Sequence, residues 1–237
     1  MKLPQFIAHR GASQVAPENT LAAFKAAKQL GATWVECDVA LTADYVPVIF
    51  HDDELSRTSN SHGKLTDFSF DELIKLDAGS WFEQKFSGEK IPSLYEVLTV
   101  CQQLQLGINI EIKPQFFQCQ QKFSRILEVI KPFWEAGYKD LLISSFSIRP
   151  LAFFLEQAPD IPRALLMQYV RPDWRYHATR LACVSVNIKA SIATPDLVQA
   201  IKQLELQVLC YTVNDQHEVN TLMKLGVDGF FSDQLFK

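Results

Sequence analysis

The stretch WVECDVA, residues 34–40, decides the fold. It is short and rich in strand-forming residues, and it carries two acids, Glu36 and Asp38, two positions apart. Successive side chains of a strand point to opposite faces, so the two acids share one face while the apolar residues pack the other. Charged residues rarely lie inside an apolar strand. The pattern therefore predicts a buried strand whose acids perform a function.

Similar runs recur along the chain and alternate with segments of helical periodicity. Eight strands are expected, at residues 5–9, 34–40 with a continuation at 46–50, 107–112, 140–145, 163–168, 183–188, 207–213 and 226–232. Seven helices are expected between them, at residues 20–30, 93–104, 117–133, 149–157, 174–180, 195–204 and 216–225. This alternation is typical of a parallel sheet. Eight strands favour a closed (β/α)₈ barrel, so we predict an α/β protein with one domain over residues 1–237.

Residues 52–92 interrupt the alternation. They are polar and rich in turn formers, with one short helical piece near residues 70–76. About 40 residues without a strand inside a compact domain usually form a functional lid or subdomain. We therefore expect an insertion that follows the second strand and caps the barrel mouth.

Composition and charge argue against several classes of protein. The net charge of −4 and the lack of a basic stripe disfavour a nucleic-acid partner. The N-terminal residues lack the apolar core of a signal peptide, and no run approaches the roughly 18 apolar residues of a membrane span. The five cysteines lack a C-x-x-C pair, so we expect buried thiols in the cytoplasm at Cys37, Cys101, Cys119, Cys183 and Cys210. Nothing in the sequence indicates an oligomeric state.

Polar residues gather where the expected strands end, which in a barrel is the mouth that carries active sites. They are His9, Arg10, Glu36, Asp38, His51, Glu111 and Lys113. Three carboxylates in one mouth repel each other unless a cation neutralises them, and oxygen ligands suit Mg²⁺ or Ca²⁺ better than zinc. The alternative is that the acids only form ion pairs with Arg10 and Lys113.

The expected mouth also contains acid/base and phosphate-binding groups. The unperturbed pKa of histidine side chains lies near neutrality, so His9 and His51 are candidates for a general acid and a general base. Arg10 and Lys113 are candidates for phosphate contacts. The other three histidines are expected to be ordinary surface residues.

These motifs resemble those of the glycerophosphodiester phosphodiesterases, especially the small cytoplasmic bacterial members. The matching stretches are IAHRGASQVAPENTLAAF, WVECDVALTADYVPVIFHDDELSRT, IPSLYEVL, INIEIKP and YTVND. They run from His9 to about Asp233, and the ordered series HRG, PENT, E-D, HD and EIK is highly specific.

The resemblance implies a TIM barrel with an insertion that caps its mouth. It implies a divalent metal on Glu36, Asp38 and Glu111, an acid/base pair of His9 and His51, and phosphate contacts from Arg10 and Lys113. Such an enzyme hydrolyses glycerophosphodiesters, for example glycerophosphocholine or glycerophosphoethanolamine, to sn-glycerol 3-phosphate and an alcohol. The resemblance leaves open which histidine is the acid, and whether water or the glycerol 2-hydroxyl attacks.

Three aromatic residues are further candidates for substrate contacts. Trp81 and Phe82 in the insertion resemble an apolar clamp, and the alternative is that they only pack the insertion itself. Tyr211 stands where many relatives carry tryptophan, so it keeps an aromatic wall but adds a hydroxyl; the alternative is an aromatic of the barrel core. Two rival functions are a phosphodiesterase for larger lipids and a non-catalytic binding barrel, and the complete set of acids and histidines counts against the second.

Overall fold

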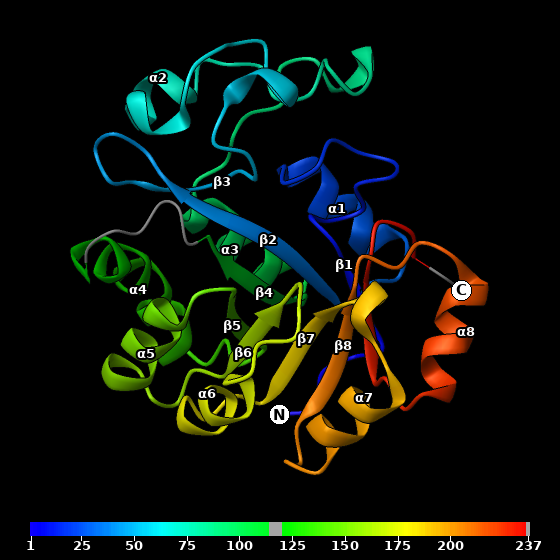
Figure 1. The fold of residues 1–237 in the computed structure, drawn as a ribbon. Helices are drawn as coiled ribbons and strands as arrows, with labels where there is room; N and C mark the ends of the chain where they lie inside the picture. Colours follow the sequence, from blue (N-terminus) through cyan, green and yellow to red (C-terminus); the bar gives the residue numbers. More distant parts are fainter. Residues whose placement is uncertain (114–119, 236–237) are drawn as a thin grey trace.

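The computed structural model describes residues 1–113 and 120–235, in which eight parallel strands close into a barrel with helices around it (Figure 1). The ring contains β1 (Phe6–Ala8), β2 (Trp34–Leu41), β4 (Gly107–Ile112), β5 (Leu141–Ser145), β6 (Arg163–Met167), β7 (Ser185–Lys189), β8 (Gln207–Tyr211) and β9 (Gly229–Ser232). Strand β1 pairs with both β2 and β9, and this closes the ring. The predicted α/β class and eight-stranded barrel are confirmed.

Strand β3 (Pro47–Ile49) corrects one part of the prediction. Residues 46–50 were expected to continue the second strand, but β3 runs antiparallel to the end of β2, with Leu41 opposite Pro47. The prediction was wrong because residues 42–45 form a tight turn, in which Tyr45 has a φ of +63° and the Thr42 hydroxyl accepts a hydrogen bond from the Val46 N–H. The hairpin brings the chain back to the barrel mouth.

The helices cover the outside of the barrel and begin at capping residues. They are α1 (Leu21–Gln29), α3 (Leu94–Gln103), α4 (Gln120–Glu135), α5 (Ile148–Gln157), α6 (Trp174–Arg180), α7 (Pro195–Lys202) and α8 (Gln216–Lys224). The side chains of Thr20, Ser93, Thr194 and Asp215 each accept a hydrogen bond from a first-turn N–H, which fixes where four helices start. The expected start of a helix at residue 117 lies outside the described residues. The described helices are all too short or too polar to cross a bilayer.

The barrel has an apolar floor and a polar mouth. A buried cluster separate from the main core contains Leu3, Ile7, Trp34, Leu142, Ala164, Leu209 and Phe231. All but Leu3, which precedes β1, lie on strands of the barrel, and they fill its interior. Glu36 and Asp38 follow Trp34 on the same face of β2, so they lie above this floor. The alternate residues of β2, including Val35 and Cys37, are fully buried against the surrounding helices.

The insertion is built from short helical turns above the mouth, drawn in cyan to green in Figure 1. It contains η1 (Leu55–Arg57), η2 (Leu65–Asp67), α2 (Phe70–Leu73) and η3 (Gln84–Phe86). The Asp77 carboxylate accepts hydrogen bonds from the N–H groups of Gly79, Ser80 and Gly88 and holds the loops together. The buried leucines of the insertion belong to the same apolar cluster as the core between the barrel strands and the helices. The insertion therefore packs continuously with the barrel. The predicted helix near residues 70–76 ends three residues earlier than expected.

The floor of the barrel requires glycine at position 107. A Cβ atom there would lie 2.2 Å from an indole carbon of Trp34, its partner on β2. We expect Gly107→Ala to lower the free energy of unfolding by about 1–3 kcal/mol, measured by urea denaturation, because the indole and strand must shift. The same change in a Trp34→Leu background should cost less. Equal losses in both backgrounds would show that the indole is not the cause.

Candidate active site

Three carboxylates meet at the barrel mouth. The register of β2 and β4 places Asp38 directly beside Glu111, and Glu36 lies one layer below Asp38 on the same face. One oxygen from each of the three side chains lies within 4.8 Å of the others. Glu36 and Asp38 are 3% and 2% exposed. The predicted metal ligands are therefore brought together in a site with little water.

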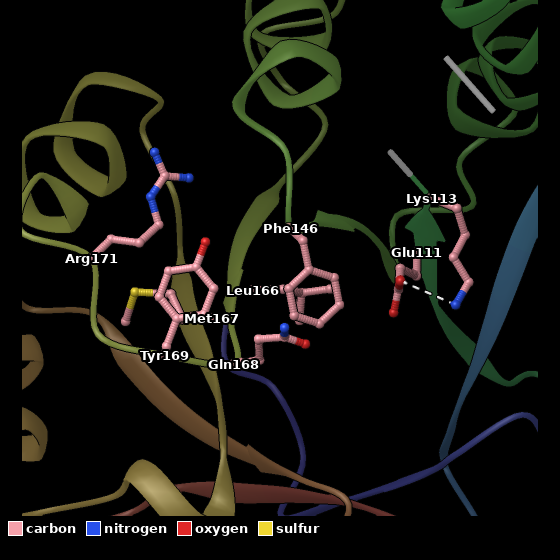
Figure 2. Close-up of a pocket in the computed structure, with 8 residues that line it drawn as sticks. All are labelled: Glu111, Lys113, Phe146, Leu166, Met167, Gln168, Tyr169 and Arg171. Carbon is pink, nitrogen blue, oxygen red and sulfur yellow. Dashed lines mark ion pairs between the residues drawn. The ribbon is translucent and has the colours of Figure 1, made fainter. Parts of the chain in front are cut away.

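The charges of this cluster are only partly balanced by protein groups. Burial and the neighbouring carboxylates raise the pKa of Glu36 well above its ordinary value, and burial with Asp38 raises the pKa of Glu111 to about 7. Burial also acts to raise the pKa of Asp38, but Lys113 and Arg10 outweigh it and hold that pKa below its ordinary value. The Glu111 Oε1 atom is buried without a hydrogen-bond partner among the described residues, and its ion pair with Lys113 Nζ is long, at 3.7 Å (Figure 2). A set of carboxylate oxygens that is only partly compensated suits a hard divalent cation.

Asp38 is held in place by three residues. Lys113 Nζ lies 3.1 Å from Asp38 Oδ1, and Arg10 Nε lies 3.4 Å from Oδ2. Asn19 Nδ2 donates to Oδ2 at 2.9 Å, while the Asp38 N–H donates to Asn19 Oδ1. Asn19 has a φ of +58°, a conformation that asparagine tolerates better than most residues. Its role was missed in the sequence, where the only signal was its place in PENT.

Arg10 connects the carboxylates to Glu18, in the loop that precedes α1. Its backbone N–H donates to Glu36 Oε2 at 2.9 Å, and its Nη1 donates to Glu18 Oε1 at 2.8 Å. Gly11 follows with a φ of +79°, and a Cβ atom there would lie 2.7 Å from Ala23 Cβ in α1. The glycine lets the strand turn tightly against the helix. This turn aims the Arg10 side chain into the mouth.

Each of the two predicted histidines is bound to an aspartate. His9 Nδ1 lies 2.7 Å from Asp233 Oδ1, and His51 Nδ1 lies 2.5 Å from Asp52 Oδ1. A carboxylate on Nδ1 fixes the ring and leaves Nε2 for chemistry. Burial lowers the pKa of His51 below its ordinary value, although the Asp38 and Asp52 carboxylates oppose this shift. Neither aspartate was singled out from the sequence: Asp52 simply follows His51, and Asp233 is 224 residues from His9.

Arg57 of the insertion forms hydrogen bonds with Asp52, the aspartate that orients His51. Its Nε donates to Asp52 Oδ2 at 2.5 Å, and its Nη1 donates to Glu18 Oε2 at 2.8 Å. Hydrogen bonds from Arg57 and His51 lower the pKa of Asp52 to about 2. Glu18 thus joins Arg57 to Arg10. These ion pairs link the insertion to Arg10, the candidate for phosphate contacts, and to Asp52, the partner of His51.

Two adjoining cavities open at the mouth. The inner cavity, of about 140 Å³, is lined by His9, Arg10, Glu36, His51, Asn109, Glu111, Lys113, Phe146, Leu166, Tyr211, Thr212 and Phe231. The outer cavity, of about 280 Å³, is lined by Glu111, Lys113, Phe146, Leu166, Met167, Gln168, Tyr169 and Arg171 (Figure 2). The two cavities share Glu111, Lys113, Phe146 and Leu166 as a common wall.

The aromatic candidates divide between the mouth and the insertion. Tyr211 lines the inner cavity and packs edge-on against Phe146, with ring centroids 5.8 Å apart. Trp81 and Phe82 pack against each other at 5.6 Å, and the Trp81 indole donates to the Ala78 carbonyl. Neither lines the inner or the outer cavity. Their role as a clamp stays a prediction, whereas the other predicted site residues surround one mouth.

Comparison with known proteins identifies close relatives. A family model described as the glycerophosphoryl diester phosphodiesterase family matches residues 9–236. A glycerophosphodiester phosphodiesterase of Caldanaerobacter subterraneus subsp. tengcongensis is 36% identical over 228 residues, which cover 96% of this chain and 93% of that protein. A putative glycerophosphodiester phosphodiesterase of Bacillus subtilis is 36% identical over 235 residues, which cover 96% of this chain and 93% of that protein. An Oleispira antarctica phosphodiesterase, solved with the product sn-glycerol-3-phosphate, is 39% identical with a TM-score of 0.91, covering 98% and 93%.

The carboxylate cluster predicts that removing one charge stabilises the metal-free protein. Glu111→Gln should raise the free energy of unfolding at pH 8 by roughly 2 kcal/mol, because a neutral amide replaces a buried charge beside Asp38. The pKa of Glu111 is about 7 in the fold against an ordinary value of 4.5, so the native state binds the extra proton between these values. Wild-type stability should therefore fall as pH rises through that window, and the variant should lack this slope.

The measurement is urea denaturation in EDTA at pH values from 5 to 8. Glu128→Gln is the matched control, because Glu128 is an exposed residue of α4 that forms an ion pair with Arg125 on the helix surface. It should show no comparable difference. A Glu111→Gln protein that is less stable than wild type at pH 8 would contradict the charge argument.

Proposed function

This chain belongs to the glycerophosphoryl diester phosphodiesterase family, as its motifs predicted, and we propose that it hydrolyses glycerophosphodiesters to sn-glycerol 3-phosphate and an alcohol. It is a phosphoric diester hydrolase. The observation that carries the proposal is a single inner cavity lined by metal-binding carboxylates and by two aspartate-bound histidines. The Oleispira relative, which was solved with sn-glycerol-3-phosphate, supports this product. Substrates of this class include glycerophosphocholine and glycerophosphoethanolamine.

The metal in this proposal is a divalent cation, Mg²⁺ or Ca²⁺, held by Glu36, Asp38 and Glu111. When bound, it would supply positive charge to a phosphate oxygen and stabilise the negative charge that develops during displacement. The lack of a hydrogen bond to Glu111 Oε1 from the described residues and the raised pKa values of both glutamates support this assignment. Asp38 keeps a lowered pKa and so offers a carboxylate over the whole neutral range.

Arg10 and Lys113 would bind the phosphate from the protein side. Both line the inner cavity and are held by carboxylates at their inner edges. Arg10 has five N–H donors and Lys113 has three, so each keeps donors for a phosphate oxygen after making its ion pairs. Tyr211 would form the aromatic wall of the same cavity.

His9 and His51 would move the protons. One Nε2 takes a proton from the attacking oxygen, while the other protonates the alkoxide that leaves phosphorus. Asp233 and Asp52 keep each ring oriented and stabilise its charged form. The same roles serve attack by water and attack by the glycerol 2-hydroxyl.

We further propose that residues 52–92 cap the mouth of this single-domain protein. Arg57 supports this, because it ties the insertion to Asp52 and Glu18 beside the inner cavity. Trp81 and Phe82 would reach a substrate only if the insertion moved toward the mouth. We propose a cytoplasmic location, supported by the buried free thiols of Cys37, Cys101, Cys183 and Cys210; Cys119 lies outside the described residues.

Purified protein should release sn-glycerol 3-phosphate from glycerophosphodiesters only when a divalent cation is present. We expect the rate to fall to background after EDTA treatment and gel filtration and to return on addition of Mg²⁺ or Ca²⁺, because protein groups balance the charge of the carboxylate cluster only in part. A coupled glycerol 3-phosphate assay measures this. Full turnover by the metal-free protein would contradict the metal assignment, and no release from any ester would contradict the function.

His9→Ala and His51→Ala should each reduce kcat by roughly 10²–10⁴-fold on glycerophosphodiesters, because each group handles one proton of the displacement. The double variant should be little worse than either single variant, since the two act as a unit. His217→Ala, an exposed histidine of α8, should retain wild-type kcat and serves as the control.

A substrate with a p-nitrophenolate leaving group separates the two roles. This group needs no protonation, so the variant that lacks the general acid should regain rate on it. The other variant should stay slow on both substrates. If neither single variant loses more than a few-fold on glycerophosphodiesters, the acid/base assignment is wrong.

A further inference from the structure

The outer cavity is placed to receive a group that leaves the phosphorus atom. The inner cavity is the smaller of the two and carries the metal-binding and acid/base groups, so the metal and the phosphate occupy it. Glu111, Lys113, Phe146 and Leu166 form the wall that both cavities share, so a chain extending from phosphorus enters the outer cavity directly. The outer cavity has twice the volume of the inner one, about 280 against 140 Å³.

The far end of the outer cavity carries a positive charge. Figure 2 shows Arg171 on the opposite side from Glu111 and Lys113, with Phe146 and Tyr169 between them. Arg171 Nε and Nη2 lie 3.2 Å from the Asp173 carboxylate, whose Oδ2 also lies 3.1 Å from His177. This ion pair is exposed to solvent, so the attraction between Arg171 and Asp173 is weak. Arg171 Nη1 has no hydrogen-bond partner in the part of the chain that the structure describes.

The charges around the cavity do not suit a cationic alcohol. Among the described residues that line it, Glu111 is the one carboxylate, and the metal site uses this group. An ammonium group at the far end would therefore meet the Arg171 guanidinium without a free carboxylate. Aromatic faces can hold quaternary ammonium groups, and Phe146 and Tyr169 are present, but a fixed guanidinium beside them opposes a second cation.

We propose that the outer cavity binds the leaving alcohol and that Arg171 favours alcohols carrying an anionic group over those that carry only an ammonium group. The inference rests on the proposed function and specifies the substrate class of that site. A carboxylate on the alcohol would accept hydrogen bonds from Arg171, and a planar guanidinium is well suited to bind it.

Glycerophosphoserine and glycerophosphoethanolamine test this, because they differ only by one carboxylate on the alcohol. For wild type we expect kcat/KM to be about tenfold higher for the serine ester, the contribution of a hydrogen bond to a charged group. Arg171→Gln should bring the ratio close to one, and Arg171→Glu should invert it. Asp173→Asn should raise the ratio, because it removes the competing carboxylate.

Arg175→Gln is the matched control. Arg175 lies on α6 over the Trp174 ring and does not line the outer cavity. Its substitution by glutamine removes the same charge as Arg171→Gln. It should leave the ratio at the wild-type value. A wild-type ratio of one or below would overturn the proposal. An equal loss on both esters in Arg171→Gln would also overturn it, because the cavity would then hold the glycerol half that the two substrates share.

Measurements of substrate binding test this inference separately from the proposed hydrolysis. Dissociation constants of the two esters for His51→Ala protein, by calorimetry with Mg²⁺, should show the same preference and the same loss when Arg171→Gln is added. If wild type releases no sn-glycerol 3-phosphate but binding still depends on Arg171, the proposed function fails. The preference of the outer cavity for an anionic group then still stands. If binding shows no preference, the inference fails even when hydrolysis is observed.

Discussion

The rest of the site depends on one electrostatic conflict, the repulsion of three largely buried carboxylates at the barrel mouth. The register of β2 and β4 forces Asp38 and Glu111 together, and the apolar floor below them provides no compensation. Protein cations and Asn19 stabilise one carboxylate fully, whereas the two glutamates keep raised pKa values. Much of the surrounding sequence serves to hold this arrangement. The HRG turn aims Arg10, and the EIK strand end supplies Lys113.

The histidines are organised differently from the carboxylates. The carboxylates come from neighbouring strands of one sheet, whereas each histidine is oriented by an aspartate outside that pair of strands. The β2–β3 hairpin returns the chain to the mouth, where the Phe50 N–H donates to the Asp38 carbonyl just before His51. Arg57 then fixes Asp52 from within the insertion. The geometry around His51 therefore depends on a segment that adds no strand to the barrel.

Local patterns in the sequence predicted most of the barrel and the main site residues. Period-two alternation located β4 to the residue, and strand ends located the acids and histidines. The reversal at β3 was missed because a polar turn of four residues separates two strand-like runs, and propensity does not indicate direction. Glu18, Asn19 and Asp233 were missed as site residues because their roles arise from contacts with distant segments. Such contacts leave no periodic signal.

The closure of the barrel joins the two ends of the chain at one functional group. Strand β1 pairs with β9 through Ala8 and Ser232, and the next residue on each strand is a member of the His9–Asp233 pair. His9 and Asp233 are separated by 224 residues in the sequence, so their contact forms only when β1 and β9 pair. The oriented imidazole therefore exists only after the final strand has docked. A chain in which β2 and β4 have paired but β9 has not docked carries all three clustered carboxylates without an oriented His9, so the orientation of this imidazole depends on closure of the barrel.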